Sequence, residues 1–184
     1  MNIVSQAEGI FYLLKGLSLQ AVGNAAIPLL LKALDIFEDL LNYDPNNSFA
    51  LRHCGEVSCI SFFLFFCKVL ALLSLITSKS NASEDPRMAK GLSLMARATE
   101  VNPLDHIAFL LRAKYLNKIG RWHQSEDLYL KSLEINPNYP SSLEHYARLL
   151  GQKNLKESAD LFRHRLNQVL SQSNLPNSVL FPTE

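Results

Sequence analysis

Cysteine and histidine are the residues of this sequence whose chemistry could support catalysis or metal binding. Cys54, Cys59 and Cys67 lie in one apolar stretch, without the short paired spacing of a zinc site. Four histidines of the second half of the chain are scattered, and none has a nearby cysteine or a fixed carboxylate in a metal-binding pattern. These are His106, His123, His145 and His164. We therefore expect reduced, buried thiols, histidines that pack or lie at the surface, no metal and no cofactor.

Other motifs of catalysis and targeting are equally weak. Serine, histidine and aspartate are present, but no nucleophile elbow or glycine-rich phosphate loop accompanies them. Glycosylation acceptors occur at 46–48 and 81–83, yet residues 1–8 lack the charged start and apolar core of a signal peptide. The formal net charge is +1, which gives no electrostatic reason to expect nucleic acid. The sequence predicts a chain that is not an enzyme and does not bind nucleic acid.

The elements of the chain are organised around a stretch from Pro103 to Pro137. Glu-Val-Asn-Pro ends at Pro103, and Glu-Ile-Asn-Pro ends 34 residues later at Pro137. Apolar residues at helical spacing predict a helix over 106–119, which Gly120 ends. A second helix is predicted over 123–135, before Pro137 stops it. A fixed period of this length is typical of helical repeats.

This stretch resembles the tetratricopeptide repeat (TPR) family, whose pattern alternates small and bulky residues. The matching residues are Ala113, Leu116, Gly120, Trp122, Ser125, Leu128, Tyr129, Ser132 and Pro137. A second copy follows, with Leu143, Tyr146, Ala147 and Leu150 in its first helix and 157–162 echoing 124–129. It departs from the pattern at the turn, where Asn154 replaces glycine, and at Arg165, which suggests that no further repeat follows. The resemblance implies an all-α, right-handed solenoid of antiparallel helix-turn-helix repeats with three to four hairpins.

The first half of the chain fits this pattern less well. Residues 7–57 look degenerate: 7–41 resembles a first unit with a second helix over 27–41, and a new first helix could begin after residue 46. Residues 87–101 read as another second helix. We predict that residues 1–86 form degenerate helical repeats, that residues 87–170 form TPR-like repeats and that residues 171–184 form a flexible tail. Because 45–103 is too long for one repeat and too short for two, it is either a repeat with an elongated first arm or two helices plus a loop.

An apolar run over 60–76, followed by a polar loop over 77–86, leaves a choice between core and membrane. It holds twelve Leu, Ile, Val or Phe residues, which favour insertion into a membrane. Lys68 lies near the centre of the run, and its cost in a membrane largely offsets that favourable free energy. The run is also short of the roughly 20 residues that a span usually needs. We expect a core helix in a cytoplasmic protein. The alternative is a membrane-anchored adaptor, held by 60–76, that displays its repeats to the cytosol.

The resemblance places function on the concave face that the first helix of each repeat lines. The inward-facing positions would be Lys114, Asn117, Lys118, Arg148 and Gln152. These side chains suit an acidic or backbone-exposing peptide of a protein partner. The residues expected to clamp a chaperone's C-terminal carboxylate are absent, since Leu110 precedes Lys114 and Glu144 precedes Arg148, so a chaperone tail is disfavoured. The sequence therefore predicts a scaffold that binds another protein, whose identity the sequence does not give. A regulatory fragment of an enzyme is the least favoured alternative.

Overall fold

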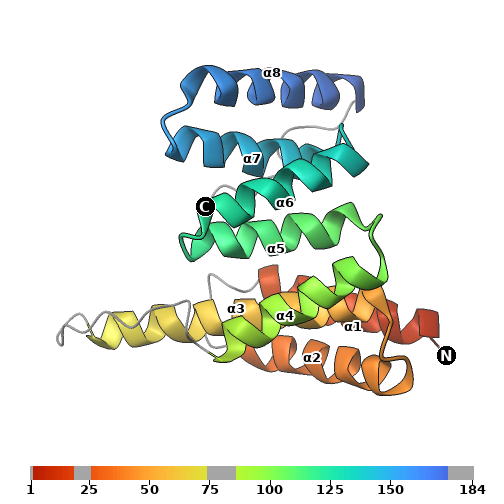
Figure 1. Ribbon diagram of the computed structural model, residues 1–184. Helices are drawn as coiled ribbons and strands as arrows, with labels where there is room; N and C mark the ends of the chain where they lie inside the picture. The colour runs from red at the N-terminus through yellow and green to blue at the C-terminus, as the bar shows by residue number, and fades with distance from the viewer. Residues whose placement is uncertain (1, 19–25, 74–85, 174–184) are drawn as a thin grey trace. The chain divides into compact units, whose positions relative to one another are not determined.

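The computed structural model describes residues 2–18, 26–73 and 86–173, apart from the side chains of 62–73, and eight α-helices account for most of them (Figure 1). No strand occurs among the described residues. The chain forms two compact units, Met1–Pro103 and Leu104–Glu184. Each unit contains two antiparallel helical hairpins, and each is described by itself below. The all-α hairpin architecture predicted from the sequence is confirmed.

Unit 1 contains the helices α1 to α4. The hairpin of α1 (Asn2–Ser18) and α2 (Ala26–Tyr43) packs through α2 on α3 (Ser48–Leu73), which pairs with α4 (Pro86–Val101). The repeat resemblance predicts a domain boundary between residues 86 and 87. The compact units of the structure instead meet between residues 103 and 104. The reason is that α4 packs extensively on α3 and so belongs with the first half of the chain.

Two glycines allow α3 and α4 to approach closely. A Cβ built on Gly55 would lie 2.6 Å from the carbonyl oxygen of Gly91. A Cβ on Gly91 would lie 2.5 Å from the sulfur of Cys59 and 2.7 Å from the oxygen of Gly55. The two backbones are therefore in direct contact at this crossing, and no larger residue fits at either position.

The apolar run lies mostly within α3, a single helix of 26 residues. With α4 it forms the two helices of the region 45–103, an arrangement that fits both alternatives from the sequence. Residues 74–76 and the loop at 77–85 lie outside the described residues, as does the side chain of Cys67. Within the part of the chain that the structure describes, no helix is both long enough and apolar enough to cross a membrane.

Unit 2 consists of α5 (His106–Lys118), α6 (Trp122–Ile135), α7 (Pro140–Gln152) and α8 (Lys156–Ser173). The first two helices match the predicted ones to within one residue at each end. Asp105 caps α5, because its carboxylate accepts hydrogen bonds from the backbone N–H groups of Ile107 and Ala108, each at 3.1 Å. The predicted tail begins inside α8, and residues 174–184 lie outside the described part of the chain.

The two turns of unit 2 use a left-handed residue at equivalent places. Gly120 has φ of +80° between α5 and α6, and Asn154 has φ of +61° between α7 and α8. Asparagine tolerates this conformation better than other non-glycine residues. The substitution that departs from the repeat pattern at Asn154 is thus compatible with the same turn.

Buried serines hold the helices of unit 2 together. The hydroxyl of Ser125 on α6 donates to the carbonyl of Ala113 on α5 at 2.8 Å. Ser132, also on α6, donates to the carbonyl of His106 at 2.8 Å, and its oxygen lies 2.7 Å from the hydroxyl of Ser142 on α7. The small residues of the repeat pattern therefore bond to the neighbouring helices as well as leaving room for them.

Candidate functional site

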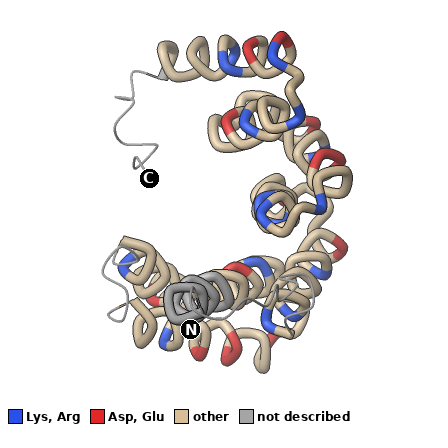
Figure 2. Tube along the Cα trace, turned by 90° about the vertical axis from the view of Figure 1, so that its left-hand side faces the viewer, with Lys and Arg blue, Asp and Glu red and all other residues tan. Residues whose placement is uncertain are grey.

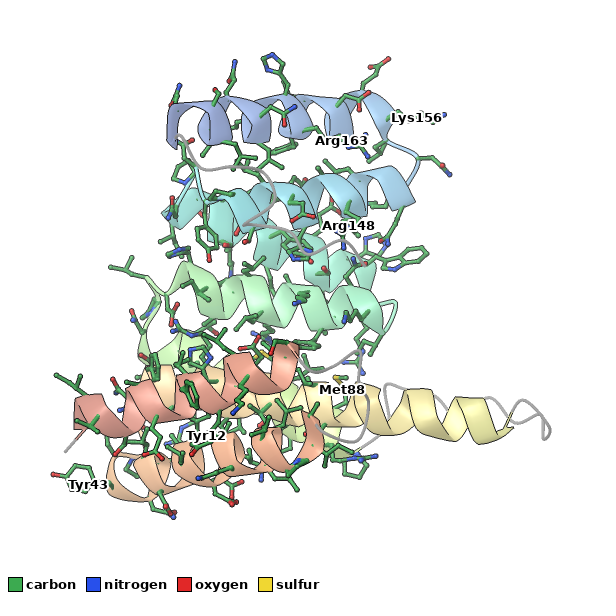
Figure 3. The ribbon with its side chains drawn as sticks, turned by 180° about the vertical axis from the view of Figure 1, so that it is seen from behind. Tyr12, Tyr43, Met88, Arg148, Lys156 and Arg163 are labelled. Carbon is green, nitrogen blue, oxygen red and sulfur yellow. The ribbon has the colours of Figure 1, made fainter. Side chains whose placement is uncertain are left out.

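The predicted binding residues come from α5 and α7 of unit 2, the first helices of its two hairpins. Lys114, Asn117 and Lys118 lie within one turn of each other near the end of α5, and Arg148 and Gln152 lie one turn apart on α7. These two helices contact each other directly. Lys114 and Asn117 are partly exposed, whereas the other three are exposed at the surface. Figure 3 shows Arg148 on α7.

The pKa of His145 indicates that cations of the two helices lie near its ring. Burial, with a smaller contribution from repulsion by Lys114, Arg148 and Lys118, lowers the pKa of its imidazole from 6.5 to about 4. Lys114 and Lys118 belong to α5 and Arg148 to α7. Three of the five predicted residues are therefore close enough to His145 to act on its charge.

Glu144 moderates this positive charge. Its carboxylate accepts a hydrogen bond from the guanidinium of Arg148 at 2.8 Å, one turn along α7. Three cations and one carboxylate leave the group with a net charge of +2. Acidic and basic positions also alternate along the traces of both units (Figure 2). The candidate face is therefore a local cationic spot that can accept an acidic side chain.

Two buried polar atoms next to this face make no hydrogen bond of good geometry among the described residues, although the Ser125 side chain interacts with the second of them. They are the side-chain oxygen of Asn117 on α5 and the hydroxyl of Tyr129 on α6. Tyr129 is fully buried, and burial raises the pKa of its phenol, so the hydroxyl keeps its proton at neutral pH. Buried polar groups are usually satisfied by protein, water or ligand, and these two atoms are too deeply buried for a partner at the surface to reach them.

Sequence reasoning did not assign His145 or Tyr129 to this face. The ring of Tyr129 stacks on that of His145, with centroids 6.5 Å apart. The repeat pattern includes Tyr129 as a packing residue, and His145 is one of the scattered histidines. Only the meeting of α5, α6 and α7 in space shows that the two belong together.

The buried thiols of unit 1 are poor candidates for chemistry. Cys54 and Cys59 are buried thiols that form no disulfide, as predicted. Burial raises the pKa of Cys54 to about 11, which keeps the thiol protonated and weakly nucleophilic at neutral pH. Within the described residues, no group of three or more His, Cys, Asp or Glu side chains could hold a metal ion.

Comparison with solved structures supports the fold. The MamA RS-1 ArsTM double mutant matches 88% of this chain and 74% of its own length, with 15% identity and a TM-score of 0.56. MamA AMB-1 matches 89% of this chain and 99% of its own, with 16% identity and a TM-score of 0.51. MamA is a TPR-like protein, so the fold defined here is a TPR-like helical repeat. No family model matches the sequence, and no curated protein matches it.

Proposed function

We propose that this chain is a protein-interaction scaffold that binds an acidic segment of a partner protein along the face formed by α5 and α7. The residues that bind the partner are Lys114, Asn117, Lys118, Arg148 and Gln152. The mechanism is recognition of an extended peptide or helix by a preformed surface, without chemistry. Helical repeats commonly present such surfaces, because stacked hairpins expose a continuous row of helices.

One observation carries the proposal. Burial lowers the pKa of His145, and Lys114, Lys118 and Arg148, which come from two different helices, each lower it as well. Placing like charges together costs free energy in the unbound protein. A carboxylate of the partner removes this repulsion on binding, so the cluster favours an acidic ligand.

Each residue has a role that follows from its position. Lys114 and Lys118 bind carboxylates as point charges, and Arg148 offers a planar donor pair that it shares with Glu144. The partly exposed side chain of Asn117 can donate its amide N–H groups to a backbone carbonyl of the ligand, since its oxygen is buried. Gln152 extends the face by one further turn of α7.

Glu144 also favours one kind of acidic ligand over another. Its carboxylate beside Arg148 would repel a single terminal carboxylate placed against α7. A segment with several acidic side chains can instead place its charges at Lys114 and Lys118, away from Glu144. We therefore propose an internal acidic segment as the ligand, rather than a chaperone's C-terminal tail.

The test is direct binding of a peptide array to the purified full chain. The array contains short peptides with several Glu or Asp residues, and the same sequences with Gln or Asn in their place. We expect the acidic peptides alone to bind, with an affinity that falls as salt rises to about 0.5 M, because exposed charge pairs are screened. Fluorescence anisotropy with the best peptide then gives the dissociation constant.

Charge-reversal variants locate the binding face. The double variant Lys114→Glu and Lys118→Glu should weaken binding by at least about tenfold, because each reversal turns an attraction into a repulsion. The control is Lys156→Glu, an exposed lysine at the start of α8, which should leave the affinity unchanged. Equal effects of the control and the double variant, or binding that ignores the charge of the peptide, would overturn the proposal.

A further inference from the structure

The first helix of unit 1 has two apolar faces on opposite sides. One face contains Gly9, Leu13 and Gly16 and packs on α2, where Gly9 meets the ring of Phe37 and Gly16 meets Leu30. The opposite face carries four large apolar side chains that are mostly exposed. They are Ile3 at 81%, Val4 at 74%, Phe11 at 56% and Leu14 at 60% of full exposure. At about 100° per residue, these side chains point away from α2.

The last helix of unit 2 shows what an end helix with a solvated outer face looks like. The exposed residues of α8 are almost all polar or charged, including Glu157, Asp160, His164 and Arg165. Leu161 is its one large exposed apolar residue, at 68%. Repeat arrays need such a polar outer face at their ends for solubility. A row of exposed apolar residues on α1, by contrast, marks a surface that binds a partner.

The spacing along this face of α1 is that of a helix-pairing seam. Val4, Ala7, Phe11, Leu14 and Ser18 follow one another at alternating steps of three and four residues. This is the spacing of the two core positions of a coiled coil. All five residues are exposed, so the seam is available to a second helix of the same kind.

Two charged residues beside the seam favour a second copy of α1 as the partner and an antiparallel orientation of the two helices. Glu8 and Lys15 lie seven residues apart, on the same side of the seam, and both are exposed. In an antiparallel pair of two α1 helices, Glu8 of each copy faces Lys15 of the other, and the twofold axis repeats the contact. In a parallel pair, Glu8 and Lys15 would instead face Ile3 and Ile10 across the partner's seam, and the two charges would not meet. The face is therefore complementary to itself in one orientation.

We propose that the exposed face of α1 is a homodimerisation surface, on which α1 of a second copy packs in the antiparallel direction. Phe11 of each copy then lies against Leu14 of the other. Ile3 and Ile10 widen the apolar contact on the side opposite the charges. This surface is separate from the face of α5 and α7, so the dimer does not depend on the function proposed above.

The first experiment measures the mass of the full chain in solution by sedimentation equilibrium over a range of concentrations. We expect a dimer that dissociates on dilution. Leu14→Gln should raise the dissociation constant at least about tenfold, since each dimer buries this leucine twice. Leu161→Gln is the matched control, because it makes the same change at a similarly exposed leucine of α8, and it should leave the constant unchanged. Circular dichroism checks that both variants keep the helical content of the wild type.

A charge exchange then tests the direction of packing. Glu8→Lys alone and Lys15→Glu alone should each weaken the dimer, and the double variant should restore it, since the pairs are re-formed with opposite polarity. A chain that is monomeric at every concentration overturns the proposal and leaves the face to a partner of different sequence. A dimer that Leu14→Gln does not weaken, or that the double exchange does not restore, overturns it as well.

Discussion

The ring of Tyr129 lies nearly parallel to the ring of His145, with centroids 6.5 Å apart and 10° between the planes. Tyr129 belongs to α6 and His145 to α7, so the stacked pair joins the two hairpins of unit 2. Burial holds the pKa of His145 at about 4, below its usual 6.5, with help from the nearby cations. The imidazole is therefore neutral at pH 7 and adds no charge to the face of α5 and α7.

His145 should make the stability of the protein depend on pH. The unfolded chain takes up the proton near pH 6.5, whereas the folded protein takes it up only near pH 4. The neutral ring therefore makes its full contribution to folding stability above pH 6.5. This contribution falls as the pH drops from 6.5 to about 4, and it is lost below pH 4. We expect a total loss of about 3 kcal/mol from this residue.

Nuclear magnetic resonance titration of the His145 ring gives its pKa directly, and urea unfolding at pH 7 and at pH 4 gives the loss of stability. The variant His145→Gln should show a smaller difference between the two pH values than the wild type. A measured pKa near 6.5 would contradict this prediction.

Ser125 should stabilise unit 2 by its size and its hydroxyl together. It is fully buried and donates to the carbonyl of Ala113. Ser125→Ala should cost about 1 kcal/mol through the lost hydrogen bond, and Ser125→Val about 2 kcal/mol, because the site has no room for added methyl groups. Urea unfolding measures both. The exposed Ser158 on α8 provides the control, as Ser158→Ala should change stability by less than about 0.5 kcal/mol.

The left-handed turns predict opposite effects for two substitutions. Gly120→Ala should destabilise the protein by about 1 kcal/mol. A Cβ there meets no atom within 4 Å, so the cost comes from the backbone conformation alone. Asn154→Gly should stabilise it by about 0.5 kcal/mol, since glycine adopts this conformation more readily. Thermal unfolding distinguishes them, and a stabilising Gly120→Ala would contradict the argument.

The crossing of α3 and α4 should tolerate no side chain. Gly55→Ala and Gly91→Ala each place a methyl group against a neighbouring backbone oxygen, and should cost about 3 kcal/mol or more. Gly151→Ala serves as the matched control. Its Cβ would lie 3.5 Å from the guanidinium of Arg163 at ordinary contact distance, and alanine favours a helix by up to about 1 kcal/mol. Circular dichroism during urea unfolding should show the first two weakened and the third unchanged or improved.

Removing the charge of Glu144 should strengthen the binding of acidic peptides. Glu144→Gln removes the charge that pairs with the Arg148 guanidinium at 2.8 Å and raises the net charge of the face. We expect about a threefold gain in affinity, and almost no loss of stability because exposed ion pairs contribute little. Fluorescence anisotropy with an acidic peptide is the measurement, and weaker binding by the variant would argue against an acidic ligand.

The local features of unit 2 were predictable because they depend on residues close together in the sequence. The helices of the first hairpin follow from apolar spacing, and Gly120 and Asn154 mark turns where the chain requires positive φ. The small residues Ser125 and Ser132 indicated close helix packing. Their hydrogen bonds to carbonyls of α5 could not be predicted, since those bonds depend on how α6 lies against its neighbour.

The features that were missed depend on residues far apart in the sequence. Gly55 and Gly91 meet only because α3 and α4 cross there, and nothing in the spacing of either glycine indicates the other. The lowered pKa of His145 requires α5 and α7 to lie side by side. The sequence of α1 shows apolar residues on both faces, but only the position of α2 decides which face is covered.

The hydroxyl of Ser132 has a consequence for how unit 2 opens. Since its proton goes to the carbonyl of His106, the contact with Ser142 must be donated by Ser142. Three helices are thereby joined in a directed relay, from α7 through α6 to α5. If either hairpin frays, this chain of hydrogen bonds breaks and buried oxygens lose their donor. Because that loss costs free energy, the stabilities of the two hairpins are coupled. Amide protons of α5 and α7 should therefore exchange with solvent in a single cooperative opening, instead of each hairpin exchanging at its own rate.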